Sequence, residues 1–276
     1  MKSCNGDKFL RVALCQIQCS LGNKDKNIAK IKSVLEENSA DLYVFPELFL
    51  TGYMIRDETS CLSESLDGCS FQTVADLSEQ YGVNILFGAV VNGDTSGILR
   101  NSAVVVHSDG RIEKYDKIHL ANFGPFEEGL YFTPGENLRI IEVCGFKFGL
   151  IICYDIFFPE LVKSYAMAGV DGVICISASP VTSKFSFETV MPARAVENAI
   201  YMIYVNQVGS QMNQVFFGGS GAMDPSGKQM VKNAYFSPDV TIATLEKSHL
   251  ERAKKMRPTI RDSLVFKRNI DVLGQE

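Results

Sequence analysis

A cysteine, a carboxylate and a lysine in three separate segments could together form a nucleophilic site. Cys153 ends the apolar run GLIIC and is followed by YDIFFPE, Glu47 lies in VFPELFLTGY, and Lys117 lies in YDKIHL. A thiol is a strong nucleophile only as the thiolate, so a reactive cysteine needs a base or a positive neighbour. Glu47 could accept the thiol proton, and Lys117 could supply the positive field. We interpret the three residues as a candidate site for cleaving an amide.

The elements that carry these residues would have to bring them together. Each residue lies at or near the end of an apolar, β-branched run, so three strands could deliver them to one edge of a sheet. Cys153 precedes Pro159, a residue tolerated in the first turn of a helix. At such a strand-to-helix turn the thiol would be exposed, and the backbone N–H of Tyr154 would point at a developing oxyanion. The alternative, a buried core cysteine, remains open at this point.

Each of the two partners also has an alternative interpretation. Glu47 has apolar or proline neighbours on both sides, and a carboxylate in such surroundings is costly to desolvate unless it is paired. Burial would raise its pKa toward that of a general base, whereas a solvated turn would leave it ordinary. Lys117 taken alone could be an edge-strand lysine, as we interpret Lys114. His119 is a second candidate base, although a packing role is favoured.

A second carboxylate lies in FGPFEEGLYFTPGE. Glu128 could orient Lys117 or the nitrogen of a substrate, and its neighbour Glu127 is expected to be solvated.

The order of the patterns predicts a four-layer αββα sandwich. Helix and strand alternate first, two hairpins follow at Asp109-Gly110 and Gly145, and helix and strand then alternate again, which is typical of two facing sheets with helices outside. We expect one α/β domain over residues 1–246 and a C-terminal extension over 247–276 that could lie at a subunit interface. The expected helices cover about residues 25–38, 70–81, 159–168 and 186–198, and the expected strands cover 10–18, 41–47, 83–91, 102–108, 111–120, 138–144, 146–153, 171–179, 201–209, 218–223 and 240–245.

Composition excludes several classes of function. The chain has 276 residues, 46% of them hydrophobic, and a net charge of -5, so no overall basic field would attract nucleic acid or anionic lipid. The basic tail from Leu250 to Arg268 is interpreted as solvated or facing another subunit. No apolar run approaches the roughly 18 residues needed to cross a bilayer. We therefore expect a soluble protein that binds neither nucleic acid nor membrane.

The cysteines indicate a reducing compartment. There are eight, and Cys15, Cys144, Cys153 and Cys175 lie in or at the ends of apolar runs, where cysteine behaves as a small hydrophobic residue. No CxxC pair occurs and the three histidines are scattered, so neither a metal site nor a redox motif is predicted. The first apolar run has no cleavage site of a signal peptide. These features favour a cytoplasmic protein with reduced thiols.

Taken together, FPELFLTGY, YDKIHL and CYDIFFPE resemble the motifs of the nitrilase superfamily of carbon–nitrogen hydrolases. The resemblance extends over about residues 9–246 and includes Phe126–Gly135, the helix Arg194–Asn198 and the run Tyr204-Val205-Asn206. It implies an αββα sandwich that dimerises, and a small-molecule amide substrate cleaved without a metal or organic cofactor. It also implies catalytic roles for a triad and a second glutamate, namely Cys153, Glu47, Lys117 and Glu128.

Within the superfamily the chain looks most like the glutaminase domain of glutamine-dependent NAD synthetases. The run Leu50–Tyr53 and the run Ala178–Pro180 carry this likeness, which implies that Tyr53 and Ser179 help to hold the substrate. Phe123, another candidate substrate contact, stands where that branch often has tyrosine. Phe185 or Lys184 stands where an arginine could grip the glutamine carboxylate. No nucleotide-binding signature is present, which favours a free-standing amidase.

The predicted reaction is hydrolysis of a primary carboxamide to acid and ammonia through a thioester on Cys153, with glutamine or a related ω-amide as a possible substrate. The alternatives are a nitrilase, a carbamoyl-amide hydrolase, and a glutaminase subunit that feeds ammonia to a separate NAD synthetase. A homodimer or higher homo-oligomer is expected.

Overall fold

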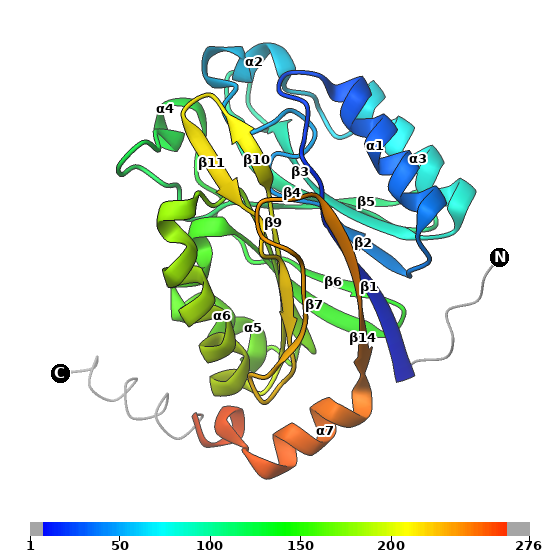
Figure 1. The fold of residues 1–276 in the computed structure, drawn as a ribbon, viewed down its shortest axis with the longest axis vertical. Coiled ribbons are helices and arrows are strands. Elements are labelled where there is room, and N and C mark those ends of the chain that lie inside the picture. The colour runs from blue at the N-terminus through cyan, green and yellow to red at the C-terminus, as the bar shows by residue number, and fades with distance from the viewer. Residues whose placement is uncertain (1–7, 264–276) are drawn as a thin grey trace.

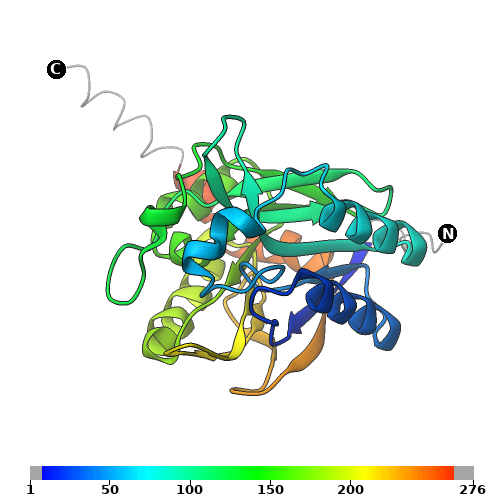
Figure 2. The same ribbon diagram turned by 90° about the horizontal axis from the view of Figure 1, so that it is seen from above.

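Two six-stranded sheets face each other between two layers of helices (Figure 1). The computed structural model describes residues 8–263. Seen from above, the two helical layers again lie on opposite sides of the sheets (Figure 2). The predicted αββα sandwich is therefore confirmed.

The first sheet has the strand order β14-β1-β2-β3-β4-β5. Strands β1, β2 and β3 are parallel, and the other neighbours pair antiparallel. In this sheet order the strands are Asp239–Glu246, Phe9–Gln16, Leu42–Val44, Asn84–Asn92, Leu99–Val106 and Ile112–Asp116.

The second sheet has the order β13-β12-β9-β8-β7-β6. Its parallel strands are β7, β8 and β9. In this sheet order the strands are Gln229–Lys232, Gly221–Met223, Tyr201–Asn206, Gly172–Ser177, Phe146–Ile152 and Ile140–Val143.

The outer helices follow the helical patterns of the sequence. Helices α1 (Lys24–Glu37) and α3 (Cys69–Tyr81) cover the first sheet, and α5 (Pro159–Met167) and α6 (Lys184–Asn198) cover the second (Figure 1). The side chain of Asn23 caps α1 by accepting a hydrogen bond from Lys26 N. Helix α3 ends at Gly82, whose φ of 63° is left-handed. Pro159 occupies the first turn of α5, as predicted.

The main core lies between the two sheets. It contains residues of both, such as Leu14 and Val44 of the first sheet and Leu150 and Ile174 of the second. Leu250 of helix α7 (Lys247–Met256) is buried in the same core. The division into a domain 1–246 and an extension 247–276 stays a prediction. Residues 264–276, which include Lys267 and Arg268 of the basic tail, lie outside the described residues.

Several small elements were not predicted. The strand expected over 201–209 ends at Asn206, and the chain then forms a separate hairpin of β10 (Val208–Gln211) and β11 (Gln214–Phe217). The short helices α2 (Thr59–Leu62) and α4 (Glu128–Tyr131) and strand β13 were also missed. These segments are too short to show a periodic pattern of their own.

Among the cysteines of residues 8–263, one differs from the expectation of reduced thiols. Cys144 is disulfide-bonded, so the expectation of a reduced thiol is wrong there. Free thiols are found at Cys15, Cys19, Cys61, Cys69, Cys153 and Cys175.

Between residues 8 and 263, every helix is too short or too polar to span a lipid bilayer.

Candidate active site

Glu47 is placed by a tight turn against strand β3. The turn follows β2, and it is fixed by hydrogen bonds from Gly88 N to Pro46 O (3.0 Å) and from Leu50 N to Gly88 O (3.0 Å). A Cβ atom on Gly88 would lie 2.0 Å from Leu48 N and 2.6 Å from Glu47 Cα. Only glycine at position 88 therefore lets the Glu47 turn approach so closely.

The Glu47 carboxylate is fully buried and fully paired. Its Oε1 accepts hydrogen bonds from Lys117 Nζ (2.8 Å) and Asn101 Nδ2 (2.8 Å), and its Oε2 accepts one from Ala178 N (2.8 Å). Burial raises the pKa of Glu47, while the charge of Lys117 opposes the rise and that of Glu128 adds to it. The alternative of a solvated turn does not apply.

Lys117 directly follows β5 and is buried between two carboxylates. Its backbone N–H donates to Asn101 O (2.9 Å), which extends the pairing with β4. Its Nζ lies 2.8 Å from Glu47 Oε1 and 2.7 Å from Glu128 Oε1. Burial alone would lower the pKa of Lys117, but the charges of Glu128 and Glu47 raise it well above its usual value. Lys114, in contrast, lies on the edge strand and pairs with Asp116, as expected of an edge lysine.

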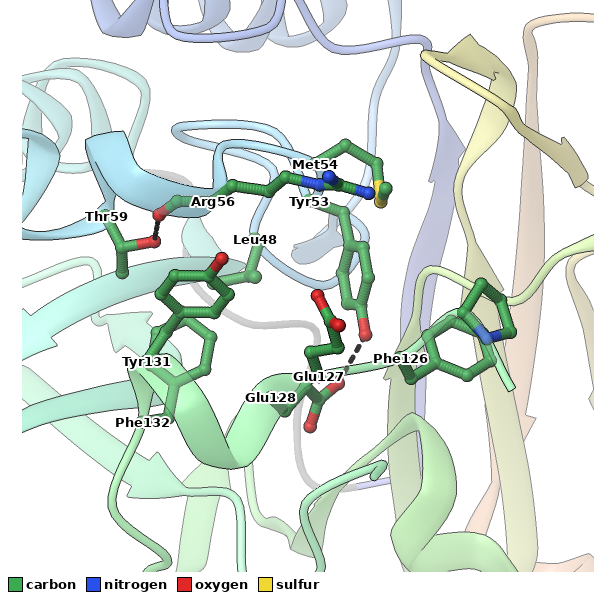
Figure 3. A pocket seen from close by; sticks show the side chains of 11 residues that line it. Leu48, Tyr53, Met54, Arg56, Thr59, Phe126, Glu127, Glu128, Tyr131 and Phe132 are labelled. Carbon is green, nitrogen blue, oxygen red and sulfur yellow. Dashed lines mark hydrogen bonds between the residues drawn. The ribbon is translucent and has the colours of Figure 1, made fainter. Parts of the chain in front are cut away.

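Glu128 begins helix α4 and is buried, whereas its neighbour Glu127 is exposed, as predicted. Its Oε1 also accepts a hydrogen bond from Tyr53 Oη (2.6 Å), and its Oε2 accepts one from Ala121 N (3.0 Å). The Tyr53 hydroxyl points directly at Glu128 (Figure 3). A small cavity of about 40 Å³ opens beside this pair, with Arg56 and Tyr131 among its lining residues.

Cys153 lies at the end of β7 with an unusual backbone. Its φ is 49°, a left-handed value that is disfavoured for a residue with a side chain, and a 3₁₀ turn (Cys153–Phe157) begins there. Its Sγ lies 3.6 Å from Ser179 Oγ. The residue is partly exposed, whereas Cys15 and Cys175 are completely buried, which argues against a purely structural cysteine.

The surroundings of the sulfur keep the thiol protonated. The sulfur lies in dense packing although the residue retains some exposed surface, and this burial raises the pKa of Cys153 to about 12. This value already includes the charge of Glu47, which adds to the rise, and the charge of Lys117, which acts against it.

The residues meet at the junction of two sheets, and the expectation of a single sheet edge is wrong. Glu47 and Lys117 follow strands of the first sheet, whereas Cys153 follows a strand of the second. The segment after β8 joins them, because Ala178 N contacts Glu47 and Ser179 Oγ contacts Cys153. Apolar runs look alike in either sheet, so the sequence could not assign these strands to one sheet or the other.

The remaining predicted residues lie around this centre. The Phe123 ring is 47% exposed, and its centroid lies 4.8 Å from that of Tyr154. Ser179 is buried and its hydroxyl lies 2.5 Å from Ser177 Oγ. Phe185 is 81% exposed.

Lys184 is occupied by other partners. Its Nζ lies 2.8 Å from Glu188 Oε2 and 4.3 Å from the centre of the Tyr235 ring.

Some residues of the site were not identified from the sequence. Asn101 contacts Glu47 through its side chain, and its only signal is a polar residue within the run NSAVVV. Asp155, in the Cys153 segment, accepts hydrogen bonds from both the backbone N–H (2.8 Å) and ring Nδ1 (3.0 Å) of His119. His119 therefore contacts a buried carboxylate and not the thiol.

Known proteins resemble this chain in sequence and in fold. The family model "Carbon-nitrogen hydrolase" matches residues 11–255. A glutamine-dependent NAD(+) synthetase of Thermotoga maritima is 34% identical over 87% of this chain, which spans only 42% of that protein. A nitrilase of Pyrococcus abyssi is 32% identical over 90% of this chain and 94% of its own length.

Among solved structures, an amidase of Nesterenkonia sp. AN1 is 25% identical, with a TM-score of 0.79 over 91% of this chain and 97% of that one. It is described as a mutant with the acetamide moiety of fluoroacetamide added covalently at the active site cysteine. A family match over most of the sequence, relatives above 30% identity and a shared αββα fold agree with one another. The chain belongs to the carbon–nitrogen hydrolase family, within the nitrilase superfamily, and is a hydrolase of carbon–nitrogen bonds.

Proposed function

We propose that the chain hydrolyses a primary carboxamide to a carboxylic acid and ammonia through a thioester on Cys153. The observation that carries the proposal is the buried group formed by Lys117 with Glu47 and Glu128, whose charges act on the thiol of the partly exposed residue Cys153. A charged lysine between two carboxylates is costly to bury, and such groups concentrate where chemistry needs them.

In the acylation step, Glu47 takes the proton of Cys153 as the sulfur attacks the carbonyl carbon. The Nζ of Lys117 and the backbone N–H of Tyr154 stabilise the resulting oxyanion. When the tetrahedral intermediate collapses, the C–N bond breaks, Glu47 returns the proton to the nitrogen, and ammonia leaves. The acyl group remains on the sulfur as a thioester.

In the second step, water replaces the thiol. Glu47 accepts a proton from the water as its oxygen attacks the thioester carbon, and the C–S bond then breaks. The proton passes to the departing sulfur, which restores Cys153 and releases the acid. Glu128 holds Lys117 in place by its hydrogen bond of 2.7 Å.

The pKa values favour general-base activation over a preformed thiolate. A thiol whose pKa is raised to about 12 is protonated near neutrality, so its proton has to be removed during the attack. Glu47, whose pKa is raised by burial, is a stronger base than an exposed glutamate. The cysteine adduct described for the Nesterenkonia amidase supports a nucleophilic role for Cys153.

The names of the relatives suggest which substrates to test first. Glutamine or another ω-amide is a candidate, because the relative from Thermotoga maritima is a glutamine-dependent synthetase. A nitrile is the second candidate, since the relative from Pyrococcus abyssi is named a nitrilase. A carbamoyl amide would be distinguished by release of CO₂ together with ammonia.

The test is an ammonia-release screen with short aliphatic amides, glutamine, asparagine, other ω-amides, carbamoyl compounds and matched nitriles. Wild-type protein should release ammonia from at least one amide, and Cys153→Ala should reduce this by about 10⁴-fold or more. Cys61→Ala, which changes an exposed free thiol, is the control and should keep full activity. Near-normal turnover by pure Cys153→Ala protein would overturn the proposal.

We further propose that the protein works as a homodimer or higher oligomer, and that a separate synthetase could use its ammonia. Light scattering should give at least twice the chain mass of 30.5 kDa. Ammonia release from glutamine, measured with and without a candidate synthetase, tests the second point. Glutamine turnover that does not change when the synthetase is added would contradict it.

A further inference from the structure

The buried carboxylate of Asp155 accepts four hydrogen bonds near Cys153. Its Oδ2 accepts from Ile152 N (3.0 Å) and Tyr115 Oη (2.8 Å). Its Oδ1 accepts from His119 N (2.8 Å) and lies 3.0 Å from His119 Nδ1, whose proton it can accept. Asp155 is 0% exposed, so these donors take the place of water around the carboxylate.

The four donors come from two segments that carry the reacting groups. Tyr115 lies in β5 of the first sheet, two residues before Lys117, and His119 lies two residues after it. Ile152 is the last residue of β7 and directly precedes Cys153 in the second sheet. One side chain thus ties the lysine segment to the cysteine turn across the sandwich.

We propose that Asp155 is a positioning residue that fixes the distance between the Lys117 ammonium and the Cys153 thiol. The inference rests on the proposed function, because it assigns Asp155 a part in the same reaction.

The conformation of the cysteine turn explains why these hydrogen bonds of Asp155 are needed. The positive φ of Cys153 is disfavoured and persists only if neighbouring contacts hold it. Asp155 holds the turn at its start through Ile152 N. His119 holds the other end, because its ring stacks on that of Phe158 with the centroids 3.5 Å apart and the planes 7° from parallel. The same residue pair therefore secures both ends of the turn.

The expected effect follows from how sensitive acyl transfer is to geometry. A displacement of about 1 Å between reacting groups can lower the rate about 100-fold. Asp155→Asn keeps the size but turns one acceptor into a donor that faces other donors, and should lower kcat by about that factor. Tyr115→Phe removes a single hydrogen bond and should lower kcat about tenfold, with KM changed less than kcat.

The matched control is Tyr165→Phe. Tyr165 is as buried as Tyr115, and its hydroxyl donates to Leu150 O (2.8 Å) and accepts from Arg139 N (3.0 Å), so unlike Tyr115 it does not donate to Asp155. Both tyrosine variants lose a buried hydroxyl, so both should lose stability to a similar degree. Only Tyr115→Phe should lose kcat.

A second measurement separates positioning from general loosening. Cys153 is alkylated with iodoacetamide over a range of pH, and the rate reports how well its thiolate is stabilised. Displacing Lys117 should slow alkylation of Tyr115→Phe and Asp155→Asn about threefold or more at a given pH, because a nearby positive charge favours the thiolate. Tyr165→Phe should alkylate at the wild-type rate.

The outcomes distinguish the inference from the proposed function. If Cys153→Ala is inactive while Tyr115→Phe keeps wild-type kcat and alkylation, the positioning role of Asp155 is wrong and the reaction stands. An equal loss of kcat in Tyr115→Phe and Tyr165→Phe would also overturn it. If Cys153→Ala stays active, the proposed reaction is wrong, and the positioning role of Asp155 in that reaction has no basis. Should Asp155→Asn not fold, Tyr115→Phe and its control still decide the question.

Discussion

At the scale of single residues, the protonation state of Glu47 sets the acid limit of activity. The base must be ionised, and burial raises its pKa above the value of about 4.3 found for an exposed glutamate. As the pH falls through this raised pKa, Glu47 gains a proton and can no longer take one from Cys153. Lys117 stays charged, because its pKa is raised well above its usual value.

We therefore expect kcat/KM to fall on the acid side at a pH above that of an ordinary glutamate, with no loss from Lys117 below about pH 10. The profile is measured with a neutral amide between about pH 4 and about pH 10, where such a substrate does not titrate. A half-maximal rate at or below about pH 4 would contradict a buried glutamate as the base.

The chemistry of the site was more predictable than the residues that support it. Glu47, Lys117 and Cys153 could be identified because charged or nucleophilic groups beside apolar runs are unusual and need a reason. Gly88 could not, since its role depends on how closely the Glu47 turn approaches β3. Such approaches between segments far apart in the chain leave no local signal.

At the scale of elements, the unpredicted β10–β11 hairpin holds the loop that carries Tyr53. Gln211, at the end of β10, accepts hydrogen bonds from Tyr53 N (2.9 Å) and Met54 N (3.0 Å) through its Oε1. Its Nε2 donates to Gln207 Oε1 (2.6 Å), and Gln207 Nε2 donates to Glu47 O (3.4 Å). The hairpin therefore connects the Tyr53 loop with the backbone of Glu47.

Gln211→Ala should loosen the Tyr53 loop and thus the hydrogen bond from Tyr53 to Glu128. We expect kcat/KM to fall about tenfold, with a loss of about 1 kcal/mol in the free energy of unfolding. Gln214→Ala, in the same hairpin, is the control, because the side chain of Gln214 hydrogen-bonds only to Asn213 (3.4 Å) among residues 8–263. Steady-state kinetics and urea unfolding measure both variants, and equal kinetics in the two would argue against the connection.

Another inter-element contact gives a pH-dependent contribution to stability. Glu188 on α6 contacts Lys184, Lys232 of β13 and Tyr235. Partial burial acts to raise the pKa of Glu188, but the hydrogen bonds from these three residues outweigh it and lower the pKa to about 2. A carboxylate with a depressed pKa stabilises the fold above its unfolded pKa, and the effect is lost as the pH falls toward about 2.

Glu188→Gln should therefore cost about 1 kcal/mol near neutrality, and the difference from wild type should shrink below about pH 4. Urea unfolding at a series of pH values measures the difference. Glu251→Gln serves as the control, because Glu251 is exposed and has no ion pair in the described part of the chain. A cost at Glu188 that does not change with pH would mean that packing, and not charge, is responsible.

Elements that show a clear period were predicted well, but their assembly was not. The helix over 70–81 matches α3, because Phe71, Val74 and Leu77 recur on one face and Gly82 ends it. The assignment of β2, β5 and β7 to two different sheets had no counterpart in their patterns. Sheet membership depends on pairing between distant strands, which local periodicity does not report.

At the scale of the whole molecule, the two facing sheets and their shared core determine how the site is assembled. Glu47 and Lys117 belong to one sheet and Cys153 to the other, so the packing between the sheets sets their separation. Direct hydrogen bonds cross this junction, from Ala178 N to Glu47 and from Tyr115 to Asp155. The αββα architecture could be predicted from the order of elements, whereas these cross-sheet contacts required the structure.

The packing of helix α7 bears on how far this core extends along the chain. It lies beyond the predicted domain boundary at residue 246, yet Leu250 is 2% exposed and packs in the core between the sheets. The family match also continues to residue 255. We expect Leu250→Ala to lower the free energy of unfolding by about 2–4 kcal/mol, because it removes a buried side chain and leaves a cavity.

Met256→Ala is the matched control, since Met256 lies in the same helix but is 81% exposed and should change stability by no more than about 0.5 kcal/mol. Urea unfolding of both variants, followed by ammonia release from the best substrate, measures the effect on stability and on the site. If Leu250→Ala behaves like Met256→Ala, α7 is an appended segment and the core ends at β14. A large loss confined to Leu250→Ala would make α7 an integral part of the sandwich, because the same core holds the two halves of the site in register.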